Sequence, residues 1–191
     1  MIKLNNISFS YGTHEVLKNF NLTVNRGECV QLRGASGSGK TTVARLVLGL
    51  ENADKGQIVV PQKISTVFQE NRLLENLDVQ KNIRLVISKD KYKLADNLIK
   101  EFNLWDSRKK RVAELSGGMK RRVAIIRAIA YNGDALILDE PFNGLDISNK
   151  LIVAKAIKRE FIDKNKPVLL ITHVKEDAEI LNARVINFEE K

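Results

Sequence analysis

The chain has 191 residues and a mass of 21.6 kDa; 43% of its residues are hydrophobic and 29% are charged. This length and composition predict one domain with a substantial core, exclude wholesale disorder and argue against two full-size domains. No window approaches the roughly 18 consecutive apolar residues of a membrane-spanning helix, and the N-terminus lacks the apolar region of a secretory signal, so we expect any membrane role to be peripheral.

The formal net charge of +9 is concentrated in one segment. Residues 81–127 hold 14 Lys and Arg against 5 Asp and Glu, whereas the remainder of the chain holds 18 of each. Such an excess favours an anionic partner, whether nucleic acid, lipid headgroups or an acidic protein face, although it is also typical of a solvated helix surface. The single cysteine, Cys29, cannot form an internal disulfide, and we expect it to be a buried thiol in the core.

Alternating apolar residues predict antiparallel strands at the N-terminus. Ile2 and Leu4, and later Leu22 and Val24, alternate with polar residues in the pattern of half-buried strands. We therefore expect residues 1–33 to form an antiparallel part that leads into the core of the domain.

The next segments predict the order strand, loop, helix. Residues 29–32 are expected to form a strand, residues 34–39 are rich in glycine, and residues 42–48 show a helical pattern that stops at Gly49.

Two further strands are expected at residues 56–60 and 63–68. Apolar residues then recur at three- and four-residue intervals, which predicts a helical insert over residues 76–115. A longer helix is expected from Ser116 to about residue 129.

The last third alternates strands with helices. An apolar run at residues 135–138 ends in two carboxylates, as a buried strand does when it reaches an active edge. Strands that alternate with helices predict an α/β fold with a mostly parallel, doubly wound sheet, whose ligand site lies at the carboxyl ends of the strands. The remaining expected elements are a helix at about 147–163, a strand at 168–172, a helix at 175–182 and a strand at 185–188.

One glycine-rich segment matches the pattern G-x-x-x-x-G-K-[ST] between a strand and a helix. Its glycines let several backbone N–H groups point at phosphate oxygens. Lys40 adds a full positive charge, Thr41 is placed to ligate Mg²⁺, and Thr42 can reach another phosphate oxygen. The motif therefore predicts a nucleoside triphosphate site rather than a merely flexible loop. Its residues are Gly34, Ala35, Ser36, Gly37, Ser38, Gly39, Lys40 and Thr41.

A second anion-binding helix start is predicted at Ser116. This residue is a good helix N-cap, and Gly117 and Gly118 leave the backbone N–H groups that follow it uncovered. A phosphate loop alone does not separate a small-molecule kinase from a GTPase or an ATP-driven motor. The second helix start is therefore the feature that distinguishes among these classes.

The phosphate loop combined with Ser116-Gly117-Gly118 resembles the nucleotide-binding subunit of ATP-binding cassette (ABC) transporters. The resemblance covers nearly the whole chain and implies an ATPase that uses ATP and Mg²⁺. It implies one ABC ATPase domain, residues 1–191, with a P-loop NTPase core, an N-terminal antiparallel β subdomain and a helical insert subdomain. The insert, at about residues 70–130, includes Ser116–Gly118, which we call the signature, and residues 131–191 complete the core.

The resemblance also implies roles for residues along the chain. Tyr11 falls where the family places an aromatic that stacks on adenine. Gln69 matches a glutamine that contacts Mg²⁺ and the attacking water. Asp146 lies in a segment like the family's loop that passes signals across a dimer, and it is implied, with the signature, to contribute to nucleotide binding.

Phosphoryl transfer requires neutralised charge, a water held in line and exclusion of solvent. By resemblance, Asp139 holds Mg²⁺, Glu140 is the general base for the attacking water, and His173 faces the γ-phosphate. Two carboxylates at a strand end can be merely solvated, and a histidine after an apolar strand is most often structural. The order of the motifs favours catalysis for all three residues, whereas His14 has no such context and is expected at the surface.

In this family the signature closes the nucleotide site of the opposite subunit. We therefore expect ATP to drive a head-to-tail dimer with a second ABC ATPase subunit, identical or homologous. The helical insert is expected to dock on membrane-spanning permease subunits, which implies a peripheral position at the cytoplasmic face of the cell membrane. A solute-binding protein is a further partner that this resemblance allows.

The family subclass is suggested by small details. Met119 and the Pro141-Phe142 pair resemble import systems for small solutes more than exporters. The stretch between Gly49 and Gln69 is compressed, and no regulatory segment follows Lys191, so we expect a compact member of the family.

Three alternatives stay open: an exporter, a non-transport ABC ATPase and a soluble P-loop kinase. Chromosome-type relatives need a long coiled coil between phosphate loop and signature, whereas Lys40 and Ser116 lie only 76 positions apart. Ribosome-type relatives usually carry two cassettes, and a kinase has no use for the signature or for His173. We therefore expect no nucleic-acid partner.

Overall fold

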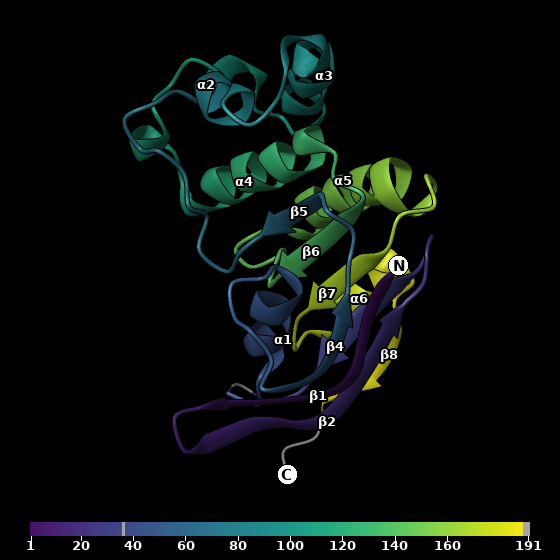
Figure 1. Cartoon of the computed structure of the whole chain (residues 1–191). Coiled ribbons are helices and arrows are strands. Elements are labelled where there is room, and N and C mark those ends of the chain that lie inside the picture. Colours follow the sequence, from purple (N-terminus) through teal and green to yellow (C-terminus); the bar gives the residue numbers. More distant parts are fainter. Residues whose placement is uncertain (36, 189–191) are drawn as a thin grey trace.

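The computed structural model describes residues 1–35 and 37–188, which form an α/β fold with two sheets (Figure 1). The strands are β1 (Ile2–Tyr11), β2 (His14–Val24), β3 (Cys29–Arg33), β4 (Lys55–Val59), β5 (Ile64–Val67), β6 (Ala135–Asp139), β7 (Val168–Ile171) and β8 (Arg184–Asn187). The helices are α1 (Lys40–Val47), α2 (Val79–Arg84), α3 (Tyr92–Glu101), α4 (Gly117–Tyr131), α5 (Ile147–Ile157) and α6 (Lys175–Leu181).

The larger sheet is parallel, with the strand order β5-β6-β7-β3-β8. Every residue of β6 and β7 is buried, because helices or the second sheet cover both faces. The continuous apolar runs that predicted buried strands follow from this double coverage. The prediction of a mostly parallel sheet is confirmed.

The smaller sheet is antiparallel, with the order β2-β1-β4. In it Leu4 lies opposite Leu22 on one side and Ile58 on the other. The strand predicted at residues 56–60 therefore joins the N-terminal sheet. By contrast, β3, which ends the expected 1–33 segment, lies between β7 and β8 and belongs to the parallel sheet.

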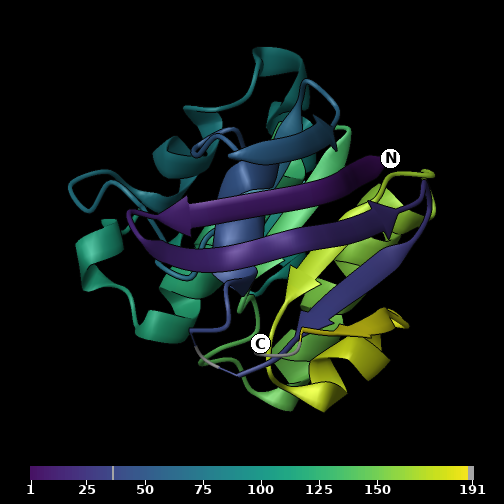
Figure 2. The same cartoon turned by 60° about the horizontal axis from the view of Figure 1, so that its bottom comes forward.

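Two hydrophobic cores form on opposite faces of the parallel sheet. Leu136 and Leu138 of β6 face the helices α4 and α5, whereas Ala135 and Ile137 pack with α1 and the antiparallel sheet. The division arises because successive side chains of a strand point to opposite faces of the sheet. In Figure 2, β1 and β2 cross in front of α1, so that α1 lies between the two sheets.

The helical insert consists of α2 and α3 with short 3₁₀ turns at Lys89–Lys91, Trp105–Ser107 and Val112–Glu114. Ile83, Leu98 and Phe102 are fully buried against α4, so the predicted periodicity reflects one shared apolar interface. Figure 1 shows the insert at the end of the molecule opposite the antiparallel sheet. Among the residues that the structure describes, no helix combines the length and apolarity needed to cross a bilayer.

Two smaller expectations can be compared with the fold. Cys29 is 3% exposed, and burial raises the pKa of its thiol to about 12, which confirms a buried core thiol. The helix expected at 147–163 is α5 followed by a π-helical turn at Lys158–Ile162, so the helical prediction holds while the hydrogen-bonding pattern changes near its end.

Candidate functional site

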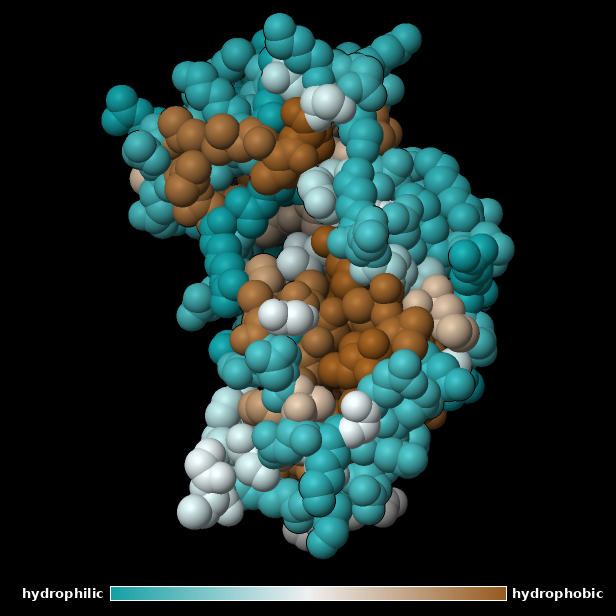
Figure 3. All heavy atoms as spheres, viewed as in Figure 1, coloured by the Kyte–Doolittle hydropathy of each residue, from teal (hydrophilic) through white to brown (hydrophobic). Residues whose placement is uncertain are grey.

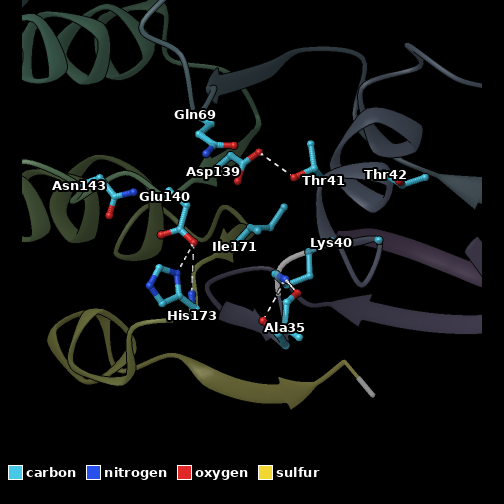
Figure 4. Close-up of a pocket in the computed structure, with 13 residues that line it drawn as sticks. Ala35, Lys40, Thr41, Thr42, Gln69, Asp139, Glu140, Asn143, Ile171 and His173 are labelled. Carbon is cyan, nitrogen blue, oxygen red and sulfur yellow. Dashed lines mark hydrogen bonds and ion pairs between the residues drawn. The ribbon is translucent and has the colours of Figure 1, made fainter. Parts of the chain in front are cut away.

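A pocket of about 560 Å³ opens at the carboxyl ends of the parallel strands (Figure 4). This is the edge at which an open α/β sheet places its ligand site. The structure brings eleven of the predicted site residues to the pocket wall, and the sequence interpretation missed Asn143 and Ile171, which also line it. The eleven are Gly34, Ala35, Gly37, Gly39, Lys40, Thr41, Thr42, Gln69, Asp139, Glu140 and His173.

The phosphate loop connects β3 to α1, as the motif requires. Gly39, the N-cap position of α1, has φ of +103°. A Cβ atom at Gly39 would lie 2.8 Å from Cγ1 of Val16, so both the backbone conformation and the close approach require glycine. The loop thus ends at a helix N-terminus that faces the pocket. The predicted site residue Ser36 lies outside the described residues.

Lys40 is only 8% exposed, and its ammonium group curls back onto the phosphate loop. The Nζ atom donates to the Gly34 carbonyl at 3.0 Å, to Ser38 Oγ at 3.2 Å and to the Ala35 carbonyl. These neutral acceptors satisfy the ammonium group without neutralising it. Its charge is therefore available to a phosphate oxygen that enters the pocket.

Thr41 and Asp139 approach each other from opposite sides of the pocket. Thr41 Oγ1 donates to Asp139 Oδ2 at 3.3 Å. Burial raises the pKa of Asp139, and the neighbouring charge of Glu140 adds to the rise. A buried carboxylate that is costly to ionise, next to a hydroxyl oxygen, fits the oxygen ligands that Mg²⁺ requires. Gln69 lies beside Asp139 at the same wall (Figure 4).

Glu140 is held by the residues that follow β7. His173 Nδ1 lies 2.9 Å from Glu140 Oε1, and the His173 backbone N–H donates to the same oxygen at 3.3 Å. Thr172 Oγ1 donates to the other oxygen, Oε2, at 3.0 Å. The Glu140 side chain is 13% exposed against 68% for His173, so the histidine can move away into solvent or toward a ligand. Glu140 also has φ of +47°, a rare conformation for a non-glycine residue.

A buried polar chain continues behind Thr172, and the sequence interpretation missed it. Thr172 Oγ1 also lies 3.3 Å from Asp177 Oδ2, and Lys150 Nζ forms an ion pair with Asp177 at 2.8 Å. Asp177 is 1% exposed, and the Lys150 ammonium group offsets its buried charge. These side chains link Glu140 to α6 and α5. The only sequence signal was a threonine at a strand end.

The signature lies outside the pocket and forms a separate edge. Ser116 caps α4, because its Oγ accepts from the Met119 N–H at 3.4 Å, and the predicted N-cap is confirmed. A Cβ atom on Gly118 would lie 2.9 Å from the Gly144 carbonyl, whereas one on Gly117 would meet nothing within 4 Å. The signature is thus packed on Gly144 and Leu145 on one side and open on the other. We call residues 116–118 and 144–146 together the signature edge.

Asp146 caps α5 rather than facing the pocket. Its carboxylate accepts from the Asn149 N–H at 2.8 Å and from Ser148 Oγ at 2.7 Å. The Asn149 backbone bond and these side-chain bonds lower the pKa of Asp146 to about 2. Its implied contribution to nucleotide binding stays a prediction.

Tyr11 stands at the end of β1, away from the pocket wall. Its side chain is 47% exposed, and its ring meets Phe9 edge-to-face with 4.8 Å between centroids. The exposed ring leaves adenine stacking as a prediction. His14, at the start of β2, is exposed as expected.

Comparison with known proteins gives a consistent result. The ABC transporter family matches residues 17–143. An aliphatic sulfonates import ATP-binding protein of Rhodococcus jostii is 37% identical over 97% of this chain and 70% of the relative. One from Shouchella clausii is 33% identical over 98% and 77%. A dimeric ATP-binding cassette solved in a post-hydrolysis state with ADP and Pi has a TM-score of 0.87 and 26% identity, covering 100% of this chain and 95% of that one. The chain therefore belongs to the ABC transporter family, and it is an ATP-binding cassette that binds and hydrolyses ATP.

Proposed function

We propose that this ATPase powers the import of a small solute as a peripheral subunit of a membrane transporter. The single observation that carries the proposal is the separation of two phosphate-seeking surfaces. The pocket holds the phosphate loop, Asp139 and Glu140, while the signature edge lies outside it. A second cassette is needed to bring a signature edge to each pocket. The relatives whose names specify import of sulfonates support the direction of transport.

The phosphate loop binds the triphosphate. Its backbone N–H groups and the N-terminus of α1 supply partial positive charge, and Lys40 exchanges its loop carbonyls for phosphate oxygens. Thr42, which is 7% exposed at the pocket wall, reaches a further phosphate oxygen. Tyr11 stacks on the adenine.

Thr41, Asp139 and Gln69 hold Mg²⁺ together with the phosphates. The metal, when bound, neutralises charge on the phosphate oxygens. The raised pKa of Asp139 supports this assignment, because a buried carboxylate gains most from a cation beside it.

Glu140 accepts a proton from the attacking water, and His173 contacts the γ-phosphate. In the described geometry these two side chains bind each other at 2.9 Å. ATP binding must separate them, because Glu140 then faces water while His173 turns to phosphate. Thr172 keeps one Glu140 oxygen in place during this exchange, since its bond goes to the oxygen that His173 does not contact.

ATP drives a head-to-tail dimer in which the signature edge of each subunit covers the nucleotide of the other. The open side of Gly117 and the N-terminus of α4 supply N–H groups to the γ-phosphate. Hydrolysis removes these contacts and favours the open state, so the work of transport is a difference in affinity between two states.

The helical insert docks on permease subunits at the cytoplasmic face of the membrane. Figure 3 shows hydrophobic surface over α2 and the segment that leads to it. Leu74, Leu85 and Val86 are 50%, 60% and 41% exposed, which is unusual for three large apolar residues in one region. This segment follows Gln69 directly, so the metal site and the docking surface are neighbours along the chain. A solute-binding protein completes the importer.

The test is transport by the reconstituted complex. The chain, together with its membrane-spanning subunits, is placed in vesicles, and solute movement is measured with Mg-ATP on the cytoplasmic side. We expect uptake toward the compartment that holds the ATPase, and its loss in the Glu140→Gln complex. Movement in the opposite direction only would overturn the import proposal while leaving the ATPase assignment intact.

A further inference from the structure

Arg121 is the most deeply buried cationic side chain of α4 that the structure describes. It is 3% exposed and lies one turn beyond the signature. Burial lowers the pKa of its guanidinium to about 10, with the charges of Asp139 and Glu140 acting in the opposite direction. Within the described part of the chain, no carboxylate comes within 4.0 Å of it. At least one of the positive charges of residues 81–127 is therefore buried inside the domain rather than on its surface.

Backbone carbonyl groups of two different loops satisfy this guanidinium. The Nη1 atom donates to the carbonyls of Phe68 and Gln69, at 2.5 and 3.2 Å. The Nη2 atom donates to those of Asp139 and Glu140, at 2.7 and 2.6 Å. The Nε atom donates to the Pro141 carbonyl at 3.0 Å. All three nitrogens are thus engaged in a fixed fork, as only arginine allows.

The bonded carbonyls belong to the residues on which hydrolysis depends. The loop after β5 carries Gln69, and the end of β6 carries Asp139 and Glu140, which meet at one wall of the pocket in Figure 4. Each carbonyl group lies in one peptide plane with the Cα atom of its own residue. The guanidinium therefore restrains the Cα positions from which the side chains of Gln69, Asp139 and Glu140 extend. The guanidinium also bonds the carbonyl of Glu140, a residue whose positive φ is a strained backbone conformation.

We propose that Arg121 is a positioning residue that fixes Gln69 and Glu140 relative to each other and ties both to the signature on the same helix. The inference rests on the proposed head-to-tail dimer. Each signature serves the nucleotide of the other subunit, whereas Arg121 connects it to the water and metal site of its own subunit. Engagement of one nucleotide is in this way transmitted to the hydrolytic groups at the other.

Arg122 provides a matched control on the same helix. Its guanidinium is also partly buried, and its Nη1 donates to the Phe102 carbonyl of the insert at 2.6 Å. Arg122→Met removes a comparable guanidinium–carbonyl bond without touching the loops that carry Gln69 or Glu140. A purely structural role for Arg121 predicts that both variants behave alike.

The first test compares Arg121→Met and Arg122→Met in the assembled complex. We expect Arg121→Met to lower kcat at least about tenfold through misplaced groups while KM for ATP stays within about threefold, because the phosphate loop is untouched. Arg121→Lys should lie between, since an ammonium group can serve only some of the carbonyls. Arg122→Met should keep kcat within about twofold even if its thermal stability falls. An equal loss of kcat in both Met variants, or none in Arg121→Met, overturns the proposal.

The second test does not depend on hydrolysis or transport. Amide hydrogen exchange is measured for residues 68–71 and 139–143 of the purified chain, and we expect about tenfold faster exchange in both segments for Arg121→Met and parental exchange for Arg122→Met. Arg121→Lys replaces Arg121→Met if the latter does not fold. If Arg121→Met exchanges at the parental rate in either segment, Arg121 does not hold that segment, and the proposal is contradicted whatever the transport assays give. If Arg121→Met exchanges faster but the complex with the parent chain does not transport solute, the role of Arg121 stands and only the proposed function is refuted.

Discussion

The pocket and the signature edge are both built around helix N-termini, yet they differ in the contacts that their side chains already make within one chain. At the pocket, side chains from three parts of the chain already contact one another: Lys40 bonds its loop, Thr41 bonds Asp139, and His173 bonds Glu140. At the signature edge, Ser116 and Asp146 only cap their own helices, and the space beside Gly117 is open.

The two surfaces therefore need different things in order to act. The pocket has its charged groups in place, whereas the signature edge is open beside Gly117, where an added Cβ would meet none of the described atoms within 4 Å. Nucleotide binding and hydrolysis should therefore respond differently to changes at the two surfaces. Mutations can separate them.

The largest effect is expected at the pocket. Glu140→Gln removes the proton acceptor but keeps the shape of the side chain, so hydrolysis in the assembled complex should slow at least about a hundredfold while ATP affinity is retained. Steady-state hydrolysis and equilibrium binding of ATP measure the two quantities. Hydrolysis at the parental rate would show that Glu140 is not the general base.

Lys40→Ala serves as the contrasting variant. It removes the buried charge of the phosphate loop, so nucleotide binding itself should be lost. Retained binding by Lys40→Ala would contradict the role of this ammonium group in phosphate recognition.

A smaller but more selective effect is expected at the signature edge. Gly117→Asp places a carboxylate where the structure leaves open space, and a negative charge in the first turn of α4 is favourable for the helix. Stability and nucleotide binding by the single chain should therefore persist, while repulsion of the partner's γ-phosphate lowers hydrolysis at least about tenfold. Gly117→Ala controls for the added Cβ. Loss of ATP binding by the isolated Gly117→Asp chain would mean that the two surfaces are not separate.

Asp146 offers a pH-dependent effect on stability. Its pKa falls from about 3.9 in an unfolded chain to about 2 when it caps α5, so its stabilisation is complete above about pH 4 and is lost as the pH falls through 2. Asp146→Ala should lower Tm by about 2–4 °C at pH 7, with the difference narrowing below pH 4. Thermal unfolding at several pH values checks this, with the exposed Asp106→Ala as control. A difference that does not change with pH would exclude the charged cap.

The smallest effect is expected from the basic run that precedes the signature. Arg108 stacks on Trp105, with 4.2 Å from its guanidinium carbon to the ring centroid, whereas residues 109–111 are exposed. Replacing all four basic residues of 108–111 by Gln should weaken association with the membrane complex in a salt-sensitive way, since each exposed charge contributes on the order of 1 kcal/mol near an anionic leaflet. Most of the loss should come from 109–111.

Co-sedimentation with vesicles that carry the membrane subunits, across a range of ionic strength, measures this loss. ATP binding should stay unchanged. A control with Gln at the exposed residues Arg26, Lys55 and Lys155 removes similar charge elsewhere. Identical vesicle-binding curves for the parent and the variant would show that the basic run is a solvated surface with no part in membrane association.

The sequence predicted those features that depend on local order. The apolar runs of β6 and β7 and the phosphate loop between β3 and α1 can be recognised because strand burial and loop chemistry leave a mark on consecutive residues. The pairing of β4 with β1 could not be predicted, since half-buried strands of this kind specify their faces but not their neighbours.

Features that depend on contacts distant in sequence were missed. Arg121 bonds carbonyls that lie 53 positions before it and 20 positions after it, and in the sequence it was one cation within a basic segment. The role of Thr172 likewise depends on the fold, because β7 places its hydroxyl between Glu140 and Asp177. Backbone carbonyl partners leave no signal in the identity of a residue, so such clamps are visible only in the folded chain.

Cross-linking across the expected interface tests whether two chains complete each other's sites. Cysteines replace Ser38 in the phosphate loop and Ser116 in the signature, in the Glu140→Gln background and within the assembled complex. The native Cys29 should not interfere, because it is buried and its pKa is raised to about 12. We expect a short bifunctional thiol reagent to join two subunits in Mg-ATP, but not without nucleotide and not when Gly117→Asp is added. Cross-linking that is the same with and without ATP, or that fails although ATP is bound, would contradict the head-to-tail account.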